Sequence, residues 1–163
     1  KLSKIDAGAV EFEKEKVNVK RLINKAIEPL LIPMEIKEQT LEISGDENAQ
    51  FTGDFNWSSE AVANIIKNCI EHTSYGGRID INFSETPIYT TIKILDNGVG
   101  IPKDDLPKIF NRFYKGKNSD KDSIGIGLAM SKSIFQKQGG IIEVASEKNK
   151  GTEFTIKIYK NVI

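Results

Sequence analysis

The chain has 163 residues, of which 39% are hydrophobic and 28% are charged, as suits one globular domain with a sizeable core. Its 23 basic and 23 acidic residues cancel, so no overall charge favours nucleic acid or an anionic membrane surface, and neither is an expected partner. A single cysteine excludes an internal disulfide framework and argues against zinc. No apolar run approaches the roughly 20 residues that span a bilayer, so we expect no direct membrane contact.

The first part of the chain is predicted to lead into a small α/β arrangement. Residues 1–8, KLSKIDAG, resemble a helix end that stops at its glycine, and residues 11–16 form a charged connector. A short strand at 17–19 and a helix at 20–31 are expected next, with Pro33 beyond the helix end. Strand-like stretches follow at 34–39, 41–44 and 50–53.

Residues 58–75, SSEAVANIIKNCIEHTSY, give the clearest helix prediction, because they have two opposed faces. One face carries an apolar stripe at i, i+3, i+4, i+7 and i+8, which indicates packing on a sheet: Val62, Ile65, Ile66, Cys69 and Ile70. Cys69 is therefore interpreted as a small buried side chain in a reducing compartment. Gly76 and Gly77 are expected to end the helix.

The other face of this helix carries Asn64, Asn68 and Glu71, with His72 beside them. Asparagine is a mediocre helix former, so two of them on one face need a reason. Their carboxamide oxygens suit Mg²⁺ or Ca²⁺, and their NH₂ groups can meet phosphate oxygens. For this helix alone, a merely solvated polar face remains the alternative. His72 has no second metal ligand near it in sequence and is treated as a polar residue at the helix end.

The second half alternates regular elements with one long polar segment. We expect strands at 78–84 and 88–96, a helix at 125–138, and a hairpin of strands 141–146 and 153–159. Residues 97–124 are too long and polar for an ordinary connection and indicate a functional lid, with one short helix near 104–110. The predicted fold class is α+β, a two-layer sandwich with about three helices on one face of a mixed, largely antiparallel sheet.

Asp96 ends a predicted strand, on the face that also carries the strand's apolar residues, and is followed by NGVGIP. An Asp/Asn-Gly hairpin turn is the simple interpretation, but no returning strand follows Pro102. The functional hypothesis is that Gly98 and Gly100 let the backbone approach a flat ligand while Asp96 accepts a hydrogen bond from it. The N6 amino group of adenine would suit such a buried carboxylate.

Gly125 and Gly127 precede the next helix, where free N–H groups and the helix dipole attract phosphate. The segment lacks the Lys-Ser/Thr pair of a Walker A loop and the strand that a Rossmann fingerprint requires, so a flexible hinge is the alternative. Lys115, Lys117 and Lys121 could neutralise phosphates or could simply be solvated. No Ser/His/Asp triad can be argued from the sequence.

Together, these segments resemble the ATP-binding catalytic domain of bacterial sensor histidine kinases, in the gyrase, chaperone, histidine kinase and mismatch-repair superfamily. The resemblance covers nearly the whole chain. In order, the segments resemble the N box (64–73), the first glycine box (96–102), the F box of the lid (109–115), the second glycine box (125–128) and the short final glycine box (151–154). Five such motifs in this order are a strong signal, although each is modest alone.

The resemblance implies ATP and Mg²⁺ as cofactors and a division into the end of a dimerisation helix with its connector (1–16) and the catalytic domain (17–163). It implies that Asn68, with Asn64, holds Mg²⁺ and that Asp96 reads adenine, with Thr152 supporting it through water. Lys115 corresponds to a basic lid residue near the terminal phosphate. The further nucleotide contacts that it implies are His72, Gly98, Gly100, Ile101, Gly125, Ile126, Gly127 and Leu128. Glu71 departs from the basic residue often found there.

The activity implied is transfer of the ATP γ-phosphoryl group to a histidine in a separate, upstream dimerisation domain. The same resemblance implies a response regulator as partner, a homodimeric, membrane-anchored parent protein and a cytoplasmic location for this part. One alternative is ATP hydrolysis, but the relatives that hydrolyse ATP place a glutamate base where this chain has Asn64. The other alternative is a non-catalytic module that keeps the fold for binding nucleotide or a partner.

Overall fold

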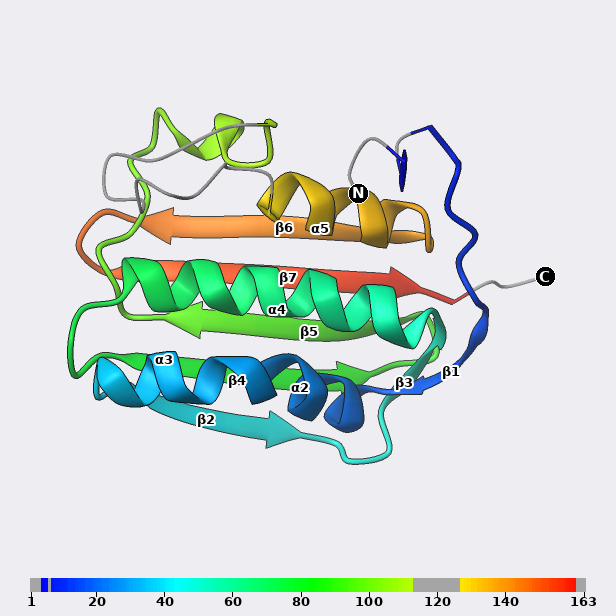
Figure 1. The fold of residues 1–163 in the computed structure, drawn as a ribbon, viewed down its shortest axis with the longest axis horizontal. Coiled ribbons are helices and arrows are strands. Elements are labelled where there is room, and N and C mark those ends of the chain that lie inside the picture. The colour runs from blue at the N-terminus through cyan, green and yellow to red at the C-terminus, as the bar shows by residue number, and fades with distance from the viewer. Residues whose placement is uncertain (1–3, 6, 113–126, 161–163) are drawn as a thin grey trace.

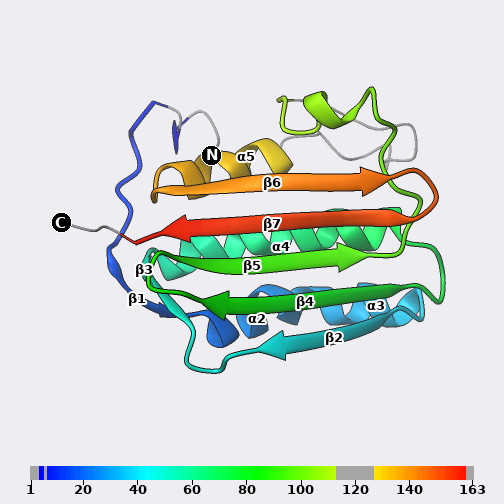
Figure 2. The same ribbon diagram turned by 180° about the vertical axis from the view of Figure 1, so that it is seen from behind.

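The computed structural model describes residues 4–5, 7–112 and 127–160, and it is built on one five-stranded sheet. In spatial order the strands are β2 (Thr40–Gly45), β4 (Arg78–Glu85), β5 (Tyr89–Asp96), β7 (Gly151–Tyr159) and β6 (Gly140–Glu147). Only the β2–β4 pair is parallel, and the other three neighbouring pairs are antiparallel (Figure 2). The carboxyl end of β5 therefore lies beside the start of β7.

The helices α2 (Val19–Ile27), α3 (Leu31–Ile36), α4 (Phe55–His72) and α5 (Gly127–Gln136) all cover the same face of the sheet (Figures 1 and 2). The chain also forms two 3₁₀ turns, η1 (Glu28–Leu30) between α2 and α3, and η2 (Leu106–Lys108) after β5. The apolar stripe of α4 is fully buried at Val62, Ile65 and Ile66. Each such side chain contributes about 1.5–3 kcal/mol through the hydrophobic effect. The predicted α+β sandwich is confirmed.

A separate two-stranded ribbon lies at one end of the sheet, where β1 (Glu15–Asn18) pairs antiparallel with β3 (Gln50–Gly53). Asp54 follows β3 and caps α4 by accepting the Trp57 N–H at 2.9 Å. Its second carboxylate oxygen accepts the Glu13 N–H at 2.9 Å. A single buried carboxylate thus fastens the connector before β1 to the start of the central helix.

Two predicted elements differ in the structure. The strand expected at 34–39 is wrong, because Leu31–Ile36 form α3. Pro33 lies in the first turn of that helix, where backbone N–H groups have no intrahelical acceptor, so the proline does not prevent a helix there. The central helix begins at Phe55 instead of residue 58 and ends at His72, before the glycines expected to stop it. At the N-terminal end the chain turns at Gly8, with φ 72°.

None of the helices in the described parts of the chain is long and apolar enough to cross a bilayer.

Candidate functional site

The predicted site residues that the structure describes lie at one end of the sheet, on the left in Figure 1. The last turns of α4, the end of β5, the start of β7 and the segment that follows Asp96 meet there. The β1–β3 ribbon lies at the other end. Residues from four motifs that are far apart in sequence are therefore brought to one place.

Asp96 is a buried carboxylate at the end of β5, with 9% of its surface exposed. It pairs in register with Thr152 of β7, and its Oδ1 accepts the Gly98 N–H at 2.9 Å. Burial is the main influence on its carboxyl group and raises its pKa, against the opposing effects of the Gly98 N–H and the neighbouring Cys69 thiol. The same carboxylate, together with burial, raises the pKa of Cys69 well above its ordinary value. A buried carboxylate of this kind is stabilised by any further hydrogen-bond donor that reaches it.

Gly98 lies directly under the end of α4. A Cβ at this position would stand 2.1 Å from the His72 carbonyl oxygen, closer than any side chain allows. The neighbouring Val99 N–H donates to the same carbonyl at 3.0 Å. Gly98 is therefore required by contact with the protein's own backbone, and not only by approach to a ligand as the sequence suggested. Gly100 has φ 73° and faces the Glu147 carbonyl across the β6–β7 turn.

Ser146 joins the two sides of the site. Its Oγ donates to the Gly151 carbonyl at 2.8 Å and accepts the Ile101 N–H at 2.7 Å. The same oxygen lies 2.9 Å from the Thr152 Oγ1. The Ser146 hydroxyl has one proton, which it donates to the Gly151 carbonyl. The Thr152 hydroxyl therefore donates to Ser146, and its own lone pairs stay available as acceptors. Thr152 is thus held in one orientation beside Asp96.

Asn64 and Asn68 lie one turn apart on α4, both half-buried. The Asn64 Nδ2 is buried and has no hydrogen-bond partner among the described residues. A Cβ at Gly127, in the first turn of α5, would lie 3.7 Å from the Asn64 side chain. No group of three or more His, Cys, Asp or Glu side chains in the described residues could hold a metal ion. A cation at this position would therefore have amide oxygens and the ligand's own oxygens as its donors.

The end of α4 is fixed by side chains from the α3–β2 loop. The Ile70 carbonyl accepts the Lys37 Nζ at 2.7 Å and the Gln39 Nε2 at 3.1 Å. Gln39 also donates to the Thr73 carbonyl at 2.8 Å. These bonds satisfy carbonyls that a helix end leaves open. They also hold His72 in place, and the His72 carbonyl in turn accepts the Val99 N–H from the segment after Asp96.

The imidazole of His72 is half-buried, and burial is the main reason that its pKa lies below the ordinary value. Glu71 and Asp96 act in the opposite direction, and Lys37 lowers the pKa further. The imidazole is therefore largely neutral at pH 7.

Part of the predicted site lies outside the described residues: Lys115, Gly125 and Ile126, together with Lys117, Lys121 and the end of the F box. Gly127 and Leu128, from the same glycine motif, form the start of α5 and are half-buried. Ile101 is likewise half-buried and held by Ser146.

Ser146 and the Lys37–Gln39 pair were not identified from sequence. The register of the predicted hairpin places Ser146 opposite Thr152 and is the one signal that could have found the serine. Nothing in the local pattern of Lys37 and Gln39 indicates that they bond a helix end more than 30 residues away.

Comparison with known proteins gives one family. Residues 53–161 match the family model described as histidine kinase-, DNA gyrase B- and HSP90-like ATPase. The heme sensor protein HssS of Staphylococcus saprophyticus is 37% identical over 161 residues, covering 98% of this chain and 34% of the relative. The sensor histidine kinase WalK of Bacillus subtilis is 30% identical over 164 residues, covering 96% of this chain and 26% of the relative. The chain thus spans about a third or less of these relatives.

Solved structures show the same fold. The catalytic domain of histidine kinase ThkA in a nucleotide-free form superimposes with a TM-score of 0.80 at 23% identity, covering 93% of this chain and 99% of that one. Full-length ShkA in complex with AMPPNP gives a TM-score of 0.85 at 20% identity, covering 99% of this chain and 34% of that one.

Proposed function

The chain belongs to the family of histidine kinase-, DNA gyrase B- and HSP90-like ATPases, and from this we propose that it is the Mg-ATP-binding catalytic domain of a two-component sensor histidine kinase. Its sequence relatives include proteins named sensor histidine kinase, and residues 17–163 would form the catalytic domain. Residues 1–16 would be the end of a dimerisation helix and its connector.

The buried Asp96 carboxylate is the observation that carries the proposal. It accepts the Gly98 N–H, lies beside an oriented Thr152 hydroxyl, and has a pKa raised by burial. The amino group of adenine would supply a further donor, and Thr152 would support the base through water. Gly98, Gly100 and Ile101 form the adjoining backbone wall. A base without this amino group would leave the buried Asp96 carboxylate without that further donor, so the site would bind it less tightly than adenine.

Asn64 and Asn68 fit a Mg²⁺ ion bound to ATP phosphates, because their carboxamide oxygens are suitable donors on two residues one turn apart on α4. The unpartnered Asn64 Nδ2 could donate to a phosphate oxygen. When bound, the ion would neutralise charge on the phosphates and make the γ-phosphoryl group a better electrophile. Lys115 would stabilise the terminal phosphate, while Gly125, Ile126, Gly127 and Leu128 would line the phosphate side with backbone N–H groups. His72 would contribute through its carbonyl, which holds the segment after Asp96.

The acceptor is proposed to be a histidine of a separate dimerisation domain in the same parent protein, with a response regulator receiving the phosphoryl group afterwards. The parent would be a membrane-anchored homodimer, with this domain in the cytoplasm. His72 is not the acceptor in this proposal, because its imidazole is half-buried at the end of α4.

Incubation with radiolabelled ATP tests the proposed activity. The domain alone should remain essentially unlabelled and should turn over little ATP, since no acceptor imidazole is held near the γ-phosphate. Addition of the separate dimerisation domain should give slow labelling of that domain, slow because the tether is lost. Asn68→Ala and Lys115→Ala should each reduce labelling, and His72→Gln should leave the labelled residue unchanged. Robust hydrolysis by the domain alone would favour the ATPase alternative, although Asn64 supplies no base. Acid-labile label on His72 would refute the acceptor assignment.

A further inference from the structure

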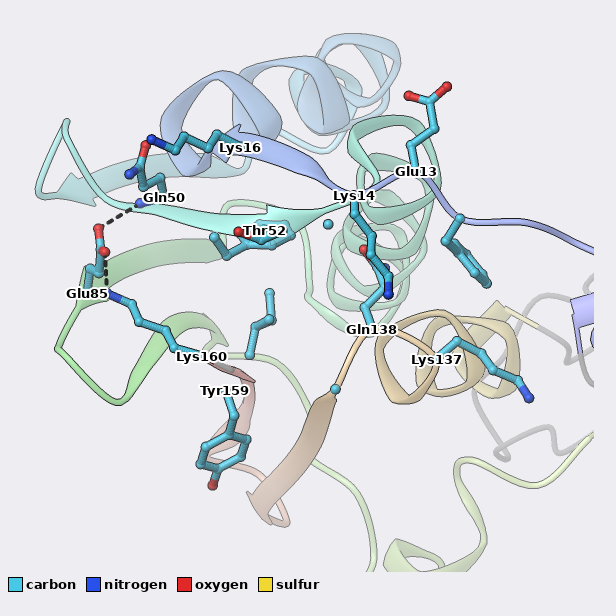
Figure 3. A pocket seen from close by; sticks show the side chains of 15 residues that line it. Glu13, Lys14, Lys16, Gln50, Thr52, Glu85, Lys137, Gln138, Tyr159 and Lys160 are labelled. Carbon is cyan, nitrogen blue, oxygen red and sulfur yellow. Dashed lines mark hydrogen bonds and ion pairs between the residues drawn. The ribbon is translucent and has the colours of Figure 1, made fainter. Parts of the chain in front are cut away.

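A cavity of about 520 Å³ lies at the end of the sheet opposite the proposed nucleotide site, between the β1–β3 ribbon and the ends of α5 and β7 (Figure 3). The connector, β3, Glu85 and residues 137–139 and 158–160 line it. Its volume falls within the roughly 300–1,000 Å³ typical of ligand sites. Nothing in the proposed kinase function uses this cavity.

One edge of β3 faces the cavity with an open pair of backbone groups. The Gln50 N–H donates to Glu85 Oε1 at 3.0 Å and its carbonyl accepts the Thr90 hydroxyl at 2.6 Å, so both groups of Gln50 point away from β1. In an antiparallel pair this direction alternates along the strand, so the N–H and carbonyl of Thr52 point the same way. The Val19 N–H donates to the Ala49 carbonyl, so Ala49 faces β1 while Gln50 faces away from it, in agreement with this alternation.

The neighbours of Thr52 on this edge are already satisfied, since the Asp54 N–H donates to Gln138 Oε1 at 2.7 Å. Outside the β1–β3 ladder, no hydrogen bond among the described residues engages the backbone of Thr52. A strand edge with one open donor and acceptor pair, flanked by bridged residues, has room for one residue of an added extended segment.

The charges around this edge are unequal, with four lysines and two glutamates on the lining. Lys160 forms an ion pair with Glu85, and the Glu13 carboxylate points away from the cavity (Figure 3). Lys14 and Lys16 are exposed and enter no ion pair with another described residue. Lys16 pairs in register with Thr52, so their side chains share one face. An acidic side chain on the residue that pairs with Thr52 would share this face with Lys16.

We propose that this cavity is a docking site for an extended acidic segment of a partner protein, one residue of which adds to the β3 edge at Thr52 while its carboxylates meet Lys14 and Lys16. The buried Phe51 and Ile158 on the lining favour apolar side chains at the alternate positions of the segment. The site adjoins the connector through Lys14, so an occupant would contact the connector and the catalytic domain together.

A capped hexapeptide of alternating glutamate and valine is the probe, followed by amide NMR of the full chain. The proposal predicts saturable shifts at Thr52, Gly139 and Lys160, and slower hydrogen exchange of the Thr52 amide. Lys14→Gln with Lys16→Gln should weaken binding roughly fivefold, as two exposed charge pairs would. Lys103→Gln with Lys108→Gln, at the other end of the sheet, is the matched control and should change nothing.

Thr52→Pro removes the N–H that faces the cavity without removing a bond to β1, so it should abolish the shifts while the chain stays folded. A peptide N-methylated at its central glutamate tests the companion bond, from the peptide N–H to the Thr52 carbonyl, should that variant fail to fold. Equal binding of a glutamine and valine peptide would overturn the acidic partner. The same shifts with inorganic phosphate alone would show a small-anion pocket instead, and the absence of any shift would overturn the site.

Discussion

The two ends of the sheet are fastened in different ways. At the proposed nucleotide end, backbone segments pack directly against each other, since Gly98 lies against the His72 carbonyl and Gly151 lies against the Asp96 carbonyl. At the connector end, side chains bridge the ribbon to the sheet, through Gln138, Glu85 and Thr90. At the first end no Cβ fits at Gly98 or Gly151, whereas the second end contains a cavity. The difference indicates that the nucleotide wall is pre-formed, whereas the connector end can accept a partner.

Gly151→Ala should give the largest effect on stability. The residue has φ 127°, and an added Cβ would lie 2.0 Å from the Asp96 carbonyl oxygen, which belongs to a central strand and cannot move away cheaply. We expect a loss of about 3 kcal/mol or more in the free energy of unfolding, measured by urea denaturation. Gly76→Ala is the control, because φ is 78° there but no atom lies within 4 Å of the added Cβ. It should cost only about 1 kcal/mol. Equal losses would mean that the backbone contact at the nucleotide end is not tight.

Gln138→Ala should give a smaller effect, confined to the connector end. It leaves the buried Asp54 N–H without its acceptor and should cost about 1–2 kcal/mol in unfolding free energy. Nucleotide affinity should stay unchanged, since the change is at the other end of the sheet. Gln136→Ala, at the exposed last residue of α5, should cost less than about 0.5 kcal/mol. A loss of nucleotide affinity in Gln138→Ala would show that the two ends are coupled.

The smallest effect concerns His72, the only histidine, whose imidazole signals are unambiguous by NMR. Its pKa should lie below 6.5, because burial disfavours the charged ring. Lys37→Met should raise the pKa and Asp96→Asn should lower it, since these charges act in opposite directions. Between the folded-state pKa of His72 and pH 6.5, this residue binds more protons in the unfolded chain than in the folded one. Its contribution to the free energy of unfolding is therefore fully present above pH 6.5 and is lost as the pH falls through the folded-state pKa. A pKa above 6.5 would contradict the burial of the ring.

The sequence predicted the parts that depend on local pattern. The stripe of α4 and the alternation of the β6–β7 hairpin follow from burial on one face, and both are confirmed. The strand predicted at 34–39 is wrong, since six residues are too few for periodicity to separate a helix from a strand. Asn64 and Asp96 were singled out from their chemistry, and Thr152 from the resemblance to the family. The bonds that hold them, from Ser146, Lys37 and Gln39, depend on contacts that only the fold creates.

Calorimetry with a non-hydrolysable ATP analogue tests the central claim most directly, namely that the buried carboxylate of Asp96 reads the adenine base. In the presence of Mg²⁺ the chain should bind the analogue, and Asp96→Asn should weaken binding by about 1.5–3 kcal/mol, the value of a charge-assisted hydrogen bond. The variant should unfold at the same temperature or higher, because burial raises the pKa of this carboxyl and the ionised form costs stability at neutral pH. Asp80→Asn, on the open face of the sheet, should bind as the unchanged chain does. Unchanged affinity in Asp96→Asn, with the fold intact, would contradict the account.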